Sequence, residues 1–186
     1  MQWSHAAEQF TNALASSDPI PGGGAAGAMA GAMGCALVLM AIGTTLKRKN
    51  TPQEAHPILE QAQKKLIGLH NTLKGFIQKD SDAYAAYLTA TKLPKDNPSR
   101  TQAVQDALWF AACVPADTAT TCLHVLKEAA LVRPLIDKII LSDIACAQHL
   151  LKGAIACSAE NIRANLIFIT DTARIEKLNK QLETFL

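Results

Sequence analysis

The sequence has 186 residues, of which 49% are hydrophobic and 18% charged, which excludes a disordered chain and is enough for one domain with a real core. Its formal net charge of +2 excludes the strong basic field that non-specific nucleic-acid binding requires. Aromatic residues reach only 5% while alanine is abundant, so we expect an all-α protein, a single domain over residues 1–186 that binds no nucleic acid.

The first expected helix covers about residues 4–15, with Ala7, Phe10 and Leu14 on one face, and turn-forming residues end it. Residues 19–46 then carry no charge and are long enough to cross a bilayer, with Lys47 opening a basic flank. The segment begins with prolines and glycines and continues mostly as alanine and glycine, which drive insertion weakly. We therefore expect a buried central helix over residues 23–46 of a soluble bundle, with a membrane span as the alternative.

Small residues recur at every fourth position of this helix, at Gly23, Gly27 and Gly31. Such spacing lets another backbone approach closely. In a soluble chain it predicts a central helix that is packed on several sides, including against a second copy of the chain.

A long helix is expected from Thr51-Pro52 to about Thr91. Its apolar residues step by three and four, and the same count reaches Asp80, which places a carboxylate on the core-facing stripe. A loop that holds Lys95 leads to a helix over residues 100–114, where Pro115 predicts a break. A further helix should end near Leu131.

From Pro134 onward a second three-four stripe passes through Asp143, Cys157 and Asn161, with Asn165 one turn later. In an unbroken helix Asp143 and Asn161 would be roughly 27 Å apart. Either the helix breaks near Gly153 or Ser158, or the two groups belong to different pockets or to pockets shared between subunits. A last amphipathic helix is expected over residues 171–185.

The two stripe carboxylates are the sharpest chemical signals. A carboxylate on a core stripe must be paired, hydrogen-bonded or facing a cavity, so Asp80 and Asp143 are either structural or have a pKa tuned for acid–base work. Asn161 and Asn165 either pack helices together or bind the polar edge of a heterocycle. Lys47 either ends a helix in solvent or meets an anionic ligand.

The glycine run matches GxGxxG at Gly22, Gly24 and Gly27, but no strand precedes it, so a dinucleotide site is not expected. The backbone amides of Gly22, Gly23 and Gly24 either bind a ligand group or serve close packing alone. Cys146 and His149 have no second pair of metal ligands, so we expect no metal site.

The cellular setting follows from the cysteines and the N-terminus. The five cysteines are scattered, without a CxxC pair, which favours a reducing, cytoplasmic setting. No basic segment followed by an apolar run opens the sequence, so no secretory signal is expected.

Several motifs in this order resemble the cyclodeaminase/cyclohydrolase family: Pro21-Gly22-Gly23-Gly24-Ala25-Ala26, Asp80 with Ala83-Tyr84, Leu93-Pro94-Lys95, Arg100, Val114-Pro115, Ser142-Asp143, Asn161-Ile162 and Asn165-Leu166. The family comprises the C-terminal domain of formimidoyltransferase-cyclodeaminase and stand-alone methenyltetrahydrofolate cyclohydrolases. The resemblance implies an all-helical homodimer that acts on a tetrahydrofolate derivative without a metal or redox cofactor.

The resemblance also implies roles for particular residues. Asp143, and after it Asp80, would be the acid–base carboxylates, Asn161 and Asn165 would orient the pterin, and Gly22 to Gly24 would line the pocket. Lys47 or Lys95 would lie near the glutamate tail. Hydrolysis of methenyltetrahydrofolate is the expected activity, with formimidoyltetrahydrofolate cyclodeamination as the alternative. Ala25 replaces the serine that the family usually has, which favours a third reading, a non-catalytic folate-binding or scaffold dimer.

Overall fold

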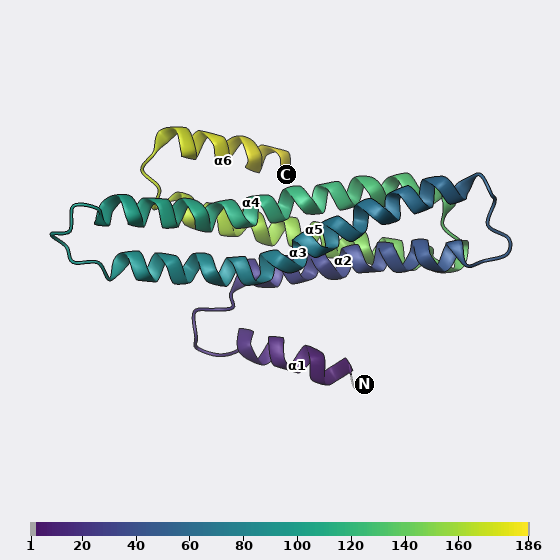
Figure 1. The fold of residues 1–186 in the computed structure, drawn as a ribbon, viewed down its shortest axis with the longest axis horizontal. Helices are drawn as coiled ribbons and strands as arrows, with labels where there is room; N and C mark the ends of the chain where they lie inside the picture. Colours follow the sequence, from purple (N-terminus) through teal and green to yellow (C-terminus); the bar gives the residue numbers. More distant parts are fainter. Residues whose placement is uncertain (1–2, 186) are drawn as a thin grey trace.

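The uncharged segment forms the central helix of the fold. In the computed structural model, which describes residues 3–185, α2 spans Gly23–Leu46 and packs against α3 (Ala55–Thr91), α4 (Arg100–Val132) and α5 (Leu141–Leu166). Figure 1 shows these four helices as a bundle elongated along their common direction. The described residues contain no strand, so the predicted all-α, single-domain fold with a glycine- and alanine-rich central helix is confirmed.

Glycines bring α5 close to α2. A Cβ added at Gly27 would lie 3.2 Å from the Cβ of Cys157, and one at Gly34 would lie 2.8 Å from the Cγ of Leu151. The contacts on α5 run backwards as those on α2 run forwards, so the two helices are antiparallel. The predicted role of the small residues, close approach of another backbone, is thus confirmed for α5.

The core side of α3 follows the predicted stripe. Its buried residues include Leu59, Ala62, Leu66, Leu73 and Phe76, and each lies three or four residues, or their sum, from the next. The helix begins at Ala55 rather than directly after Pro52. The same stripe brings Asp80 to the side of α3 that faces α2.

Pro115 lies inside α4, so the predicted break after Val114 is wrong. A proline leaves the carbonyl four residues earlier without its backbone donor, and here that carbonyl belongs to Ala111. The Nδ2 of Asn165, on α5, donates to the oxygen of Ala111 at 3.4 Å. A side-chain donor from α5 thus replaces the backbone donor that the carbonyl of Ala111 lacks because residue 115 is a proline.

The segment before α5 differs from the helix that we expected from Pro134 onward. It forms two short 3-10 turns, η1 (Arg133–Leu135) and η2 (Lys138–Ile140). The side chain of Asp137 caps η2 by accepting the N–H of Ile139 at 3.0 Å. From Leu141 onward α5 is continuous through Gly153 and Ser158 to Leu166, so no break shortens the distance between Asp143 and Asn161.

Two shorter helices lie outside the bundle, on opposite sides of it in Figure 1: α1 (Trp3–Leu14) and α6 (Thr172–Phe185). The carboxylate of Asp171 caps α6 by accepting the N–H of Ala173 at 2.9 Å. Leu178 and Leu182 of α6 are buried in a second hydrophobic cluster against α4 and α5. Most side chains of α1 are exposed, and Phe10 and Leu14 are half-buried.

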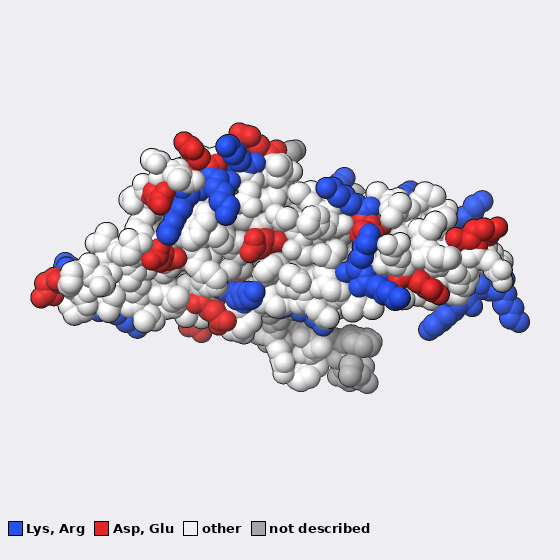
Figure 2. Space-filling model, turned by 45° about the horizontal axis from the view of Figure 1, so that its top comes forward, with Lys and Arg blue, Asp and Glu red and all other residues white. Residues whose placement is uncertain are grey.

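Charges of both signs are interspersed over the face that carries α4 and α6 (Figure 2), as the small net charge predicts. By length and composition alone, two helical stretches could cross a membrane, Gly23–Leu46 and Lys138–Leu166, and 56% of the apolar window in the first is buried inside the bundle. The central helix therefore packs into the core of the bundle on one side, and its other side is exposed at the surface of the chain.

Candidate active site

Asp80 caps the first turn of α2 from a different helix. Gly22, the N-cap residue, makes no side-chain capping hydrogen bond, and the N–H of Ala25 instead donates to Oδ2 of Asp80 at 2.9 Å. A Cβ added at Gly24 would lie 2.0 Å from Oδ1 of Asp80. The carboxylate therefore rests directly on the glycine backbone, and only glycine at position 24 leaves room for this contact.

The carboxyl group of Asp80 is half-buried, and its environment changes its acidity. Burial raises its pKa above the ordinary aspartate value, and the hydrogen bond from the Ala25 N–H opposes that rise to a smaller extent. A raised carboxyl pKa moves the group toward the neutral range, where general acid–base catalysis is most efficient. Asp80 thus has the setting of a proton-transfer group.

Asn161 of α5 borders the same turn from the other side. Its Nδ2 lies 3.3 Å from the position that a Cβ of Gly23 would take and donates to the carbonyl oxygen of Cys157 at 2.9 Å. Among the described residues no donor reaches the side-chain oxygen of Asn161, so this acceptor is free for a ligand. The glycine turn is thus flanked by a carboxylate and by an amide oxygen.

Asn165, which we predicted to act with Asn161 on a pterin, uses its amide group within the fold. Its Nδ2 donates to the backbone carbonyl oxygen of Asn161 at 2.9 Å and to the backbone carbonyl oxygen of Ala111 at 3.4 Å. One amide hydrogen thus closes a contact within α5, and the other joins α5 to α4. Only the side-chain oxygen of Asn165 is left for the predicted ligand contact.

Asp143 lies at the other end of the bundle. It is half-buried in the first turn of the continuous helix α5. Its separation from Asn161 equals five full helical turns, so both side chains leave the same face of α5, but roughly 27 Å apart. Within one chain the structure brings together Asp80, the Gly22–Gly24 turn and Asn161, and it leaves Asp143 outside this group.

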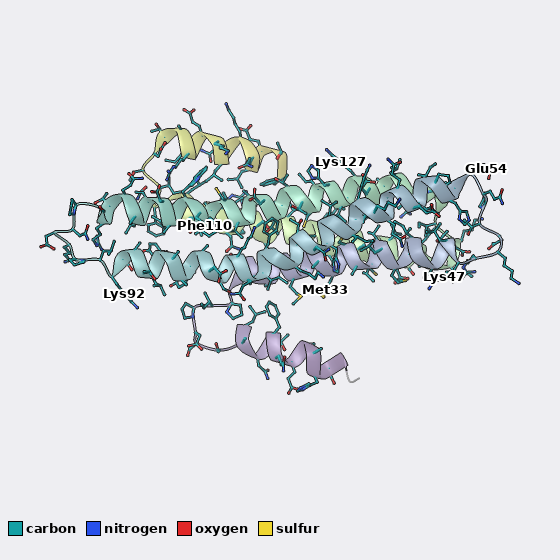
Figure 3. The ribbon with its side chains drawn as sticks, viewed as in Figure 1. Met33, Lys47, Glu54, Lys92, Phe110 and Lys127 are labelled. Atoms are coloured by element: carbon teal, nitrogen blue, oxygen red, sulfur yellow. The ribbon has the colours of Figure 1, made fainter. Side chains whose placement is uncertain are left out.

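The two lysines predicted near a glutamate tail are also distant from this turn. Lys47 is exposed just after the C-terminal end of α2, roughly 35 Å along the helix from Gly24. Lys95 is exposed in the loop between α3 and α4. Figure 3 labels Lys47 at one end of the bundle and Lys92, which precedes the loop of Lys95, at the other. Neither lysine lies beside Asp80 in the same chain.

An apolar groove opens next to the glycine turn, between α1 and α2. Its volume is about 430 Å³, and its walls are formed by Ala6, Ala7, Phe10, Thr11, Leu14, Ala26, Met29 and Met33. Figure 3 shows Met33 on the side of α2 that faces α1. The groove begins directly after Ala25, so it runs from the candidate site along the open face of α2.

Within residues 3–185 no three His, Cys, Asp or Glu side chains gather where they could hold a metal ion. The pair of Cys146 and His149 accordingly has no third ligand. The polar groups that a ligand would meet at the glycine turn are the carboxylate of Asp80, the amide of Asn161 and backbone N–H groups at the positive end of a helix.

Sequence reasoning missed two features of this site. The first is the backbone N–H of Ala25, whose partner is 55 positions away, and no local pattern indicates such a contact. The second is Cys157, which is exposed and whose Cβ lies 3.2 Å from the position that a Cβ of Gly27 would take, one turn before Asn161. The stripe that predicted Asn161 also passes through Cys157, so the signal for this residue was present in the sequence.

Comparisons with known proteins agree with this architecture. A family model described as formiminotransferase-cyclodeaminase matches residues 6–184. The methenyltetrahydrofolate cyclohydrolase of Methylorubrum extorquens is 36% identical over 96% of this chain and 88% of its own length. The formimidoyltransferase-cyclodeaminase of Sus scrofa is 30% identical over 95% of this chain but only 33% of its own length.

A solved structure extends the likeness to the fold. The crystal structure of formiminotetrahydrofolate cyclodeaminase from Thermotoga maritima superposes with a TM-score of 0.80, at 25% identity, over 100% of this chain and 91% of that one. The bundle and its glycine turn thus define an all-helical protein of the class to which these folate enzymes belong. The chain is a member of the formiminotransferase-cyclodeaminase family, and the resemblance found in its sequence motifs is confirmed.

Proposed function

We propose that this chain hydrolyses methenyltetrahydrofolate to formyltetrahydrofolate. The observation that carries the proposal is the half-buried carboxyl of Asp80, whose pKa is raised by burial and which rests on the first turn of α2. The 36% identity to a methenyltetrahydrofolate cyclohydrolase, over nearly all of both chains, supports this substrate over other folates.

Asp80 would serve the two proton transfers of the reaction. Water adds to the cationic carbon that bridges two nitrogens of the substrate, and the carboxylate accepts a proton from that water as the carbon–oxygen bond forms. The same carboxyl then returns this proton to one nitrogen as its bond to carbon breaks. The hydroxyl of the intermediate releases its remaining proton to solvent water, and its oxygen becomes the carbonyl of a formyl group on the other nitrogen. The negative charge of Asp80 also stabilises the cationic substrate beforehand.

Asn161 and the glycine turn would orient the substrate. The free side-chain oxygen of Asn161 can accept a hydrogen bond from a pterin N–H. The amide groups of Gly23 and Gly24 point out of the N-terminal end of α2 and suit a carbonyl oxygen or the developing hydroxyl of the intermediate. Since no step needs redox chemistry or a Lewis acid, we propose that no metal or redox cofactor takes part.

Cyclodeamination of formimidoyltetrahydrofolate is the second candidate. The solved structure that superposes with a TM-score of 0.80 is named as a formiminotetrahydrofolate cyclodeaminase, and expulsion of ammonia would use the same acid–base carboxyl. Purified protein should therefore be given each folate separately. Loss of the near-ultraviolet absorbance of methenyltetrahydrofolate, corrected for spontaneous hydrolysis, indicates the hydrolase, and its appearance from formimidoyltetrahydrofolate indicates the cyclodeaminase.

The same assay decides the role of Asp80. Asp80→Asn should lower turnover at least tenfold while helical circular dichroism is unchanged, because the amide keeps the shape but transfers no proton. Asp82→Asn, an exposed neighbour on the same helix, should keep full turnover. A chain that binds either folate but turns over neither is the non-catalytic dimer instead.

We also propose that the protein is a homodimer of the cytoplasm. All five cysteines are free thiols, which suits a reducing compartment. The dimer is supported by the open apolar side of α2.

A further inference from the structure

The helix that carries Asp80 continues past the beginning of α2. A Cβ added at Gly24 would meet Asp80, and one added at Gly31, two turns later, would meet Leu73 of α3, so α3 runs antiparallel to α2. Positions that follow Asp80 on α3 therefore extend beyond the glycine turn, where α2 has not yet begun. Residues 81–91 of α3 thus border the candidate site from beyond the start of α2.

Both tyrosines of the chain lie on this stretch of α3. Tyr84 follows Asp80 by one helical turn and Tyr87 follows it by two, so both side chains leave the side of α3 that carries the carboxylate. Along the helix axis they lie roughly 6 Å and 10 Å from Asp80. Both are half-buried, so each ring is packed on one part of its surface and open on another.

Tyr87 is fixed by the core and supports Tyr84. The side chain of Tyr87 packs against the second hydrophobic cluster, which includes Leu108 of α4 and Ile162 of α5. Among the described residues Tyr84 belongs to neither hydrophobic cluster. Its ring centroid lies 6.2 Å from that of Tyr87, with the two planes tilted by 47°, which is within the range of favourable aromatic pairs. The ring of Tyr84 is therefore held beside the core without being part of it.

The direction of helical side chains brings the ring of Tyr84 toward Asp80. The Cα–Cβ bonds of an α-helix tilt toward its N-terminus, and a long side chain covers the turn that precedes its own residue. The turn that precedes Tyr84 is the one that carries Asp80. An aromatic ring and a carboxylate thus lie next to one another at the start of α2, where Gly23 is exposed.

We propose that Tyr84 is a substrate-binding residue that selects for positive charge, with its ring against the cationic methenyl bridge of the folate, so that the site binds this cation more tightly than the neutral formyl product. The inference rests on the proposed function, because that function supplies the cationic substrate.

Two groups of the site then favour a cation. The face of an aromatic ring carries negative charge density and attracts a cation that lies over it, and the carboxylate of Asp80 attracts the same cation through its charge. Methenyltetrahydrofolate is positive across the carbon that bridges its two nitrogens, whereas the formyl product is neutral there. Hydrolysis therefore removes the charge that held the substrate against Tyr84, and the product leaves more easily.

Such a contact has a distinct kinetic signature. The positive charge is complete in the bound substrate, but it is already being neutralised by the incoming oxygen in the transition state. The ring of Tyr84 thus stabilises the substrate at least as much as the transition state. An interaction of this kind lowers KM and does not raise kcat, so its removal should raise KM without lowering kcat.

Two substitutions at one position separate the ring from its hydroxyl. Tyr84→Leu keeps an apolar side chain and should raise KM for methenyltetrahydrofolate by about threefold to thirtyfold, with kcat unchanged or higher. The inhibition constant of formyltetrahydrofolate, measured in the same absorbance assay, should change by less than about twofold, because this neutral folate has no charge for the ring to bind. Tyr84→Phe keeps the ring and should retain the wild-type constants.

Phe110→Leu is the matched control. Phe110 is 44% exposed and lines an apolar groove together with Ala86, which leaves α3 roughly 120° around the helix from Asp80. The control thus removes an exposed aromatic ring that faces away from the site, and all constants should stay at their wild-type values. Equal changes in Tyr84→Leu and Phe110→Leu overturn the proposal.

Two other outcomes overturn the charge selection. In Tyr84→Leu, a proportional rise of KM for the cation and of the inhibition constant for the neutral product would make Tyr84 an ordinary contact. A loss of kcat in Tyr84→Phe would assign the hydroxyl rather than the ring.

A wild-type chain that does not hydrolyse methenyltetrahydrofolate refutes the proposed function, and equilibrium binding of the two folates then decides the role of Tyr84. The proposal stands if the wild type binds methenyltetrahydrofolate more tightly than formyltetrahydrofolate and Tyr84→Leu narrows that ratio. An equal ratio in wild type and variant overturns it.

Discussion

The effect of replacing a glycine in this chain depends on which atoms already occupy the space that a new side chain would fill. At Gly24 that place holds the carboxylate of Asp80, 2.0 Å from an added Cβ. At Gly75, on the exposed side of α3, nothing lies within 4 Å. A substitution at Gly24 therefore tests whether the site requires glycine for steric reasons. The same substitution at Gly75 measures only the low helix propensity of glycine.

Gly24→Ala should lower the free energy of unfolding by about 1–3 kcal/mol, because the methyl group forces Asp80 away from the N–H of Ala25. Gly75→Ala should instead raise it by up to about 1 kcal/mol, since alanine is the better helix former and meets no obstacle. Urea unfolding of both variants is the measurement. Equal effects of the two substitutions would show that Asp80 does not rest on Gly24.

Asp80 should make stability depend on pH in the opposite sense to a salt-bridged aspartate. Its pKa is raised by burial, so the folded state holds the proton more tightly than the unfolded state does. Its contribution to stability is therefore present below the ordinary aspartate pKa and is lost as the pH rises through the raised, folded pKa. Asp80→Asn has no such loss, and asparagine can still accept the Ala25 N–H.

The difference in Tm between Asp80→Asn and wild type should therefore increase with pH across the acidic range and level off near neutrality, with the variant at least as stable there. Thermal unfolding from about pH 4 to about pH 8 measures it. Asp80→Asn should also lack activity, so a single substitution should remove turnover without lowering stability near neutral pH. A difference that grows on acidification would mean that the folded pKa is lowered instead.

At the scale of helices, α4 passes through Pro115 because α5 supplies a donor. Asn165 is predicted to be worth about 1–3 kcal/mol to stability, since Asn165→Ala leaves the carbonyl of Ala111 without a partner. In Pro115→Ala the backbone N–H at position 115 replaces that donor. The loss from Asn165→Ala should then be smaller, and a double-mutant cycle of unfolding free energies measures the difference. Purely additive effects would contradict the compensation.

The helices themselves were largely predictable from periodicity and turn residues. The bounds of α2 agree with the sequence prediction at both ends, and the stripe of α3 placed Asp80 on the side of the core. The break at Pro115 was predicted wrongly because its compensation comes from Asn165, on another helix. Local sequence rules describe the backbone N–H that a proline lacks. They contain no information about a hydrogen-bond donor that a neighbouring helix supplies in its place.

The candidate site was predictable in its residue types but not in its grouping. Counting along α5 gave both the shared face and the separation of Asp143 and Asn161, and the continuous helix confirms the separation. The contact of Asp80 with Ala25 joins two helices, and only the packed structure shows it. What the count could not decide was whether the distant residues belong to one site, because in the proposed homodimer that depends on how two copies pack together.

At the scale of the whole molecule, the chain buries two hydrophobic clusters of different extent. The larger one runs through the bundle of α2, α3, α4 and α5. The smaller one lies beneath α6, where Leu178 and Leu182 meet Leu108 of α4 and Ile162 of α5. Outside this cluster Arg174 binds Asp106 at 2.8 Å and lies over the ring of Trp109, so α6 is held by apolar burial and by exposed charge together.

The apolar part should dominate, because exposed ion pairs contribute little. Leu178 is fully buried, and Leu178→Ala should lower the free energy of unfolding by about 2–5 kcal/mol. Leu131→Ala, at a side chain that is 57% exposed, should change it by less than about 0.5 kcal/mol. Because α6 packs on the side of α4 and α5 that faces away from α2, the folded fraction of Leu178→Ala should turn over substrate at the wild-type rate. A lower rate per folded molecule would show that α6 positions Asn161 through the neighbouring Ile162, and the site would then extend through α5 to the second cluster.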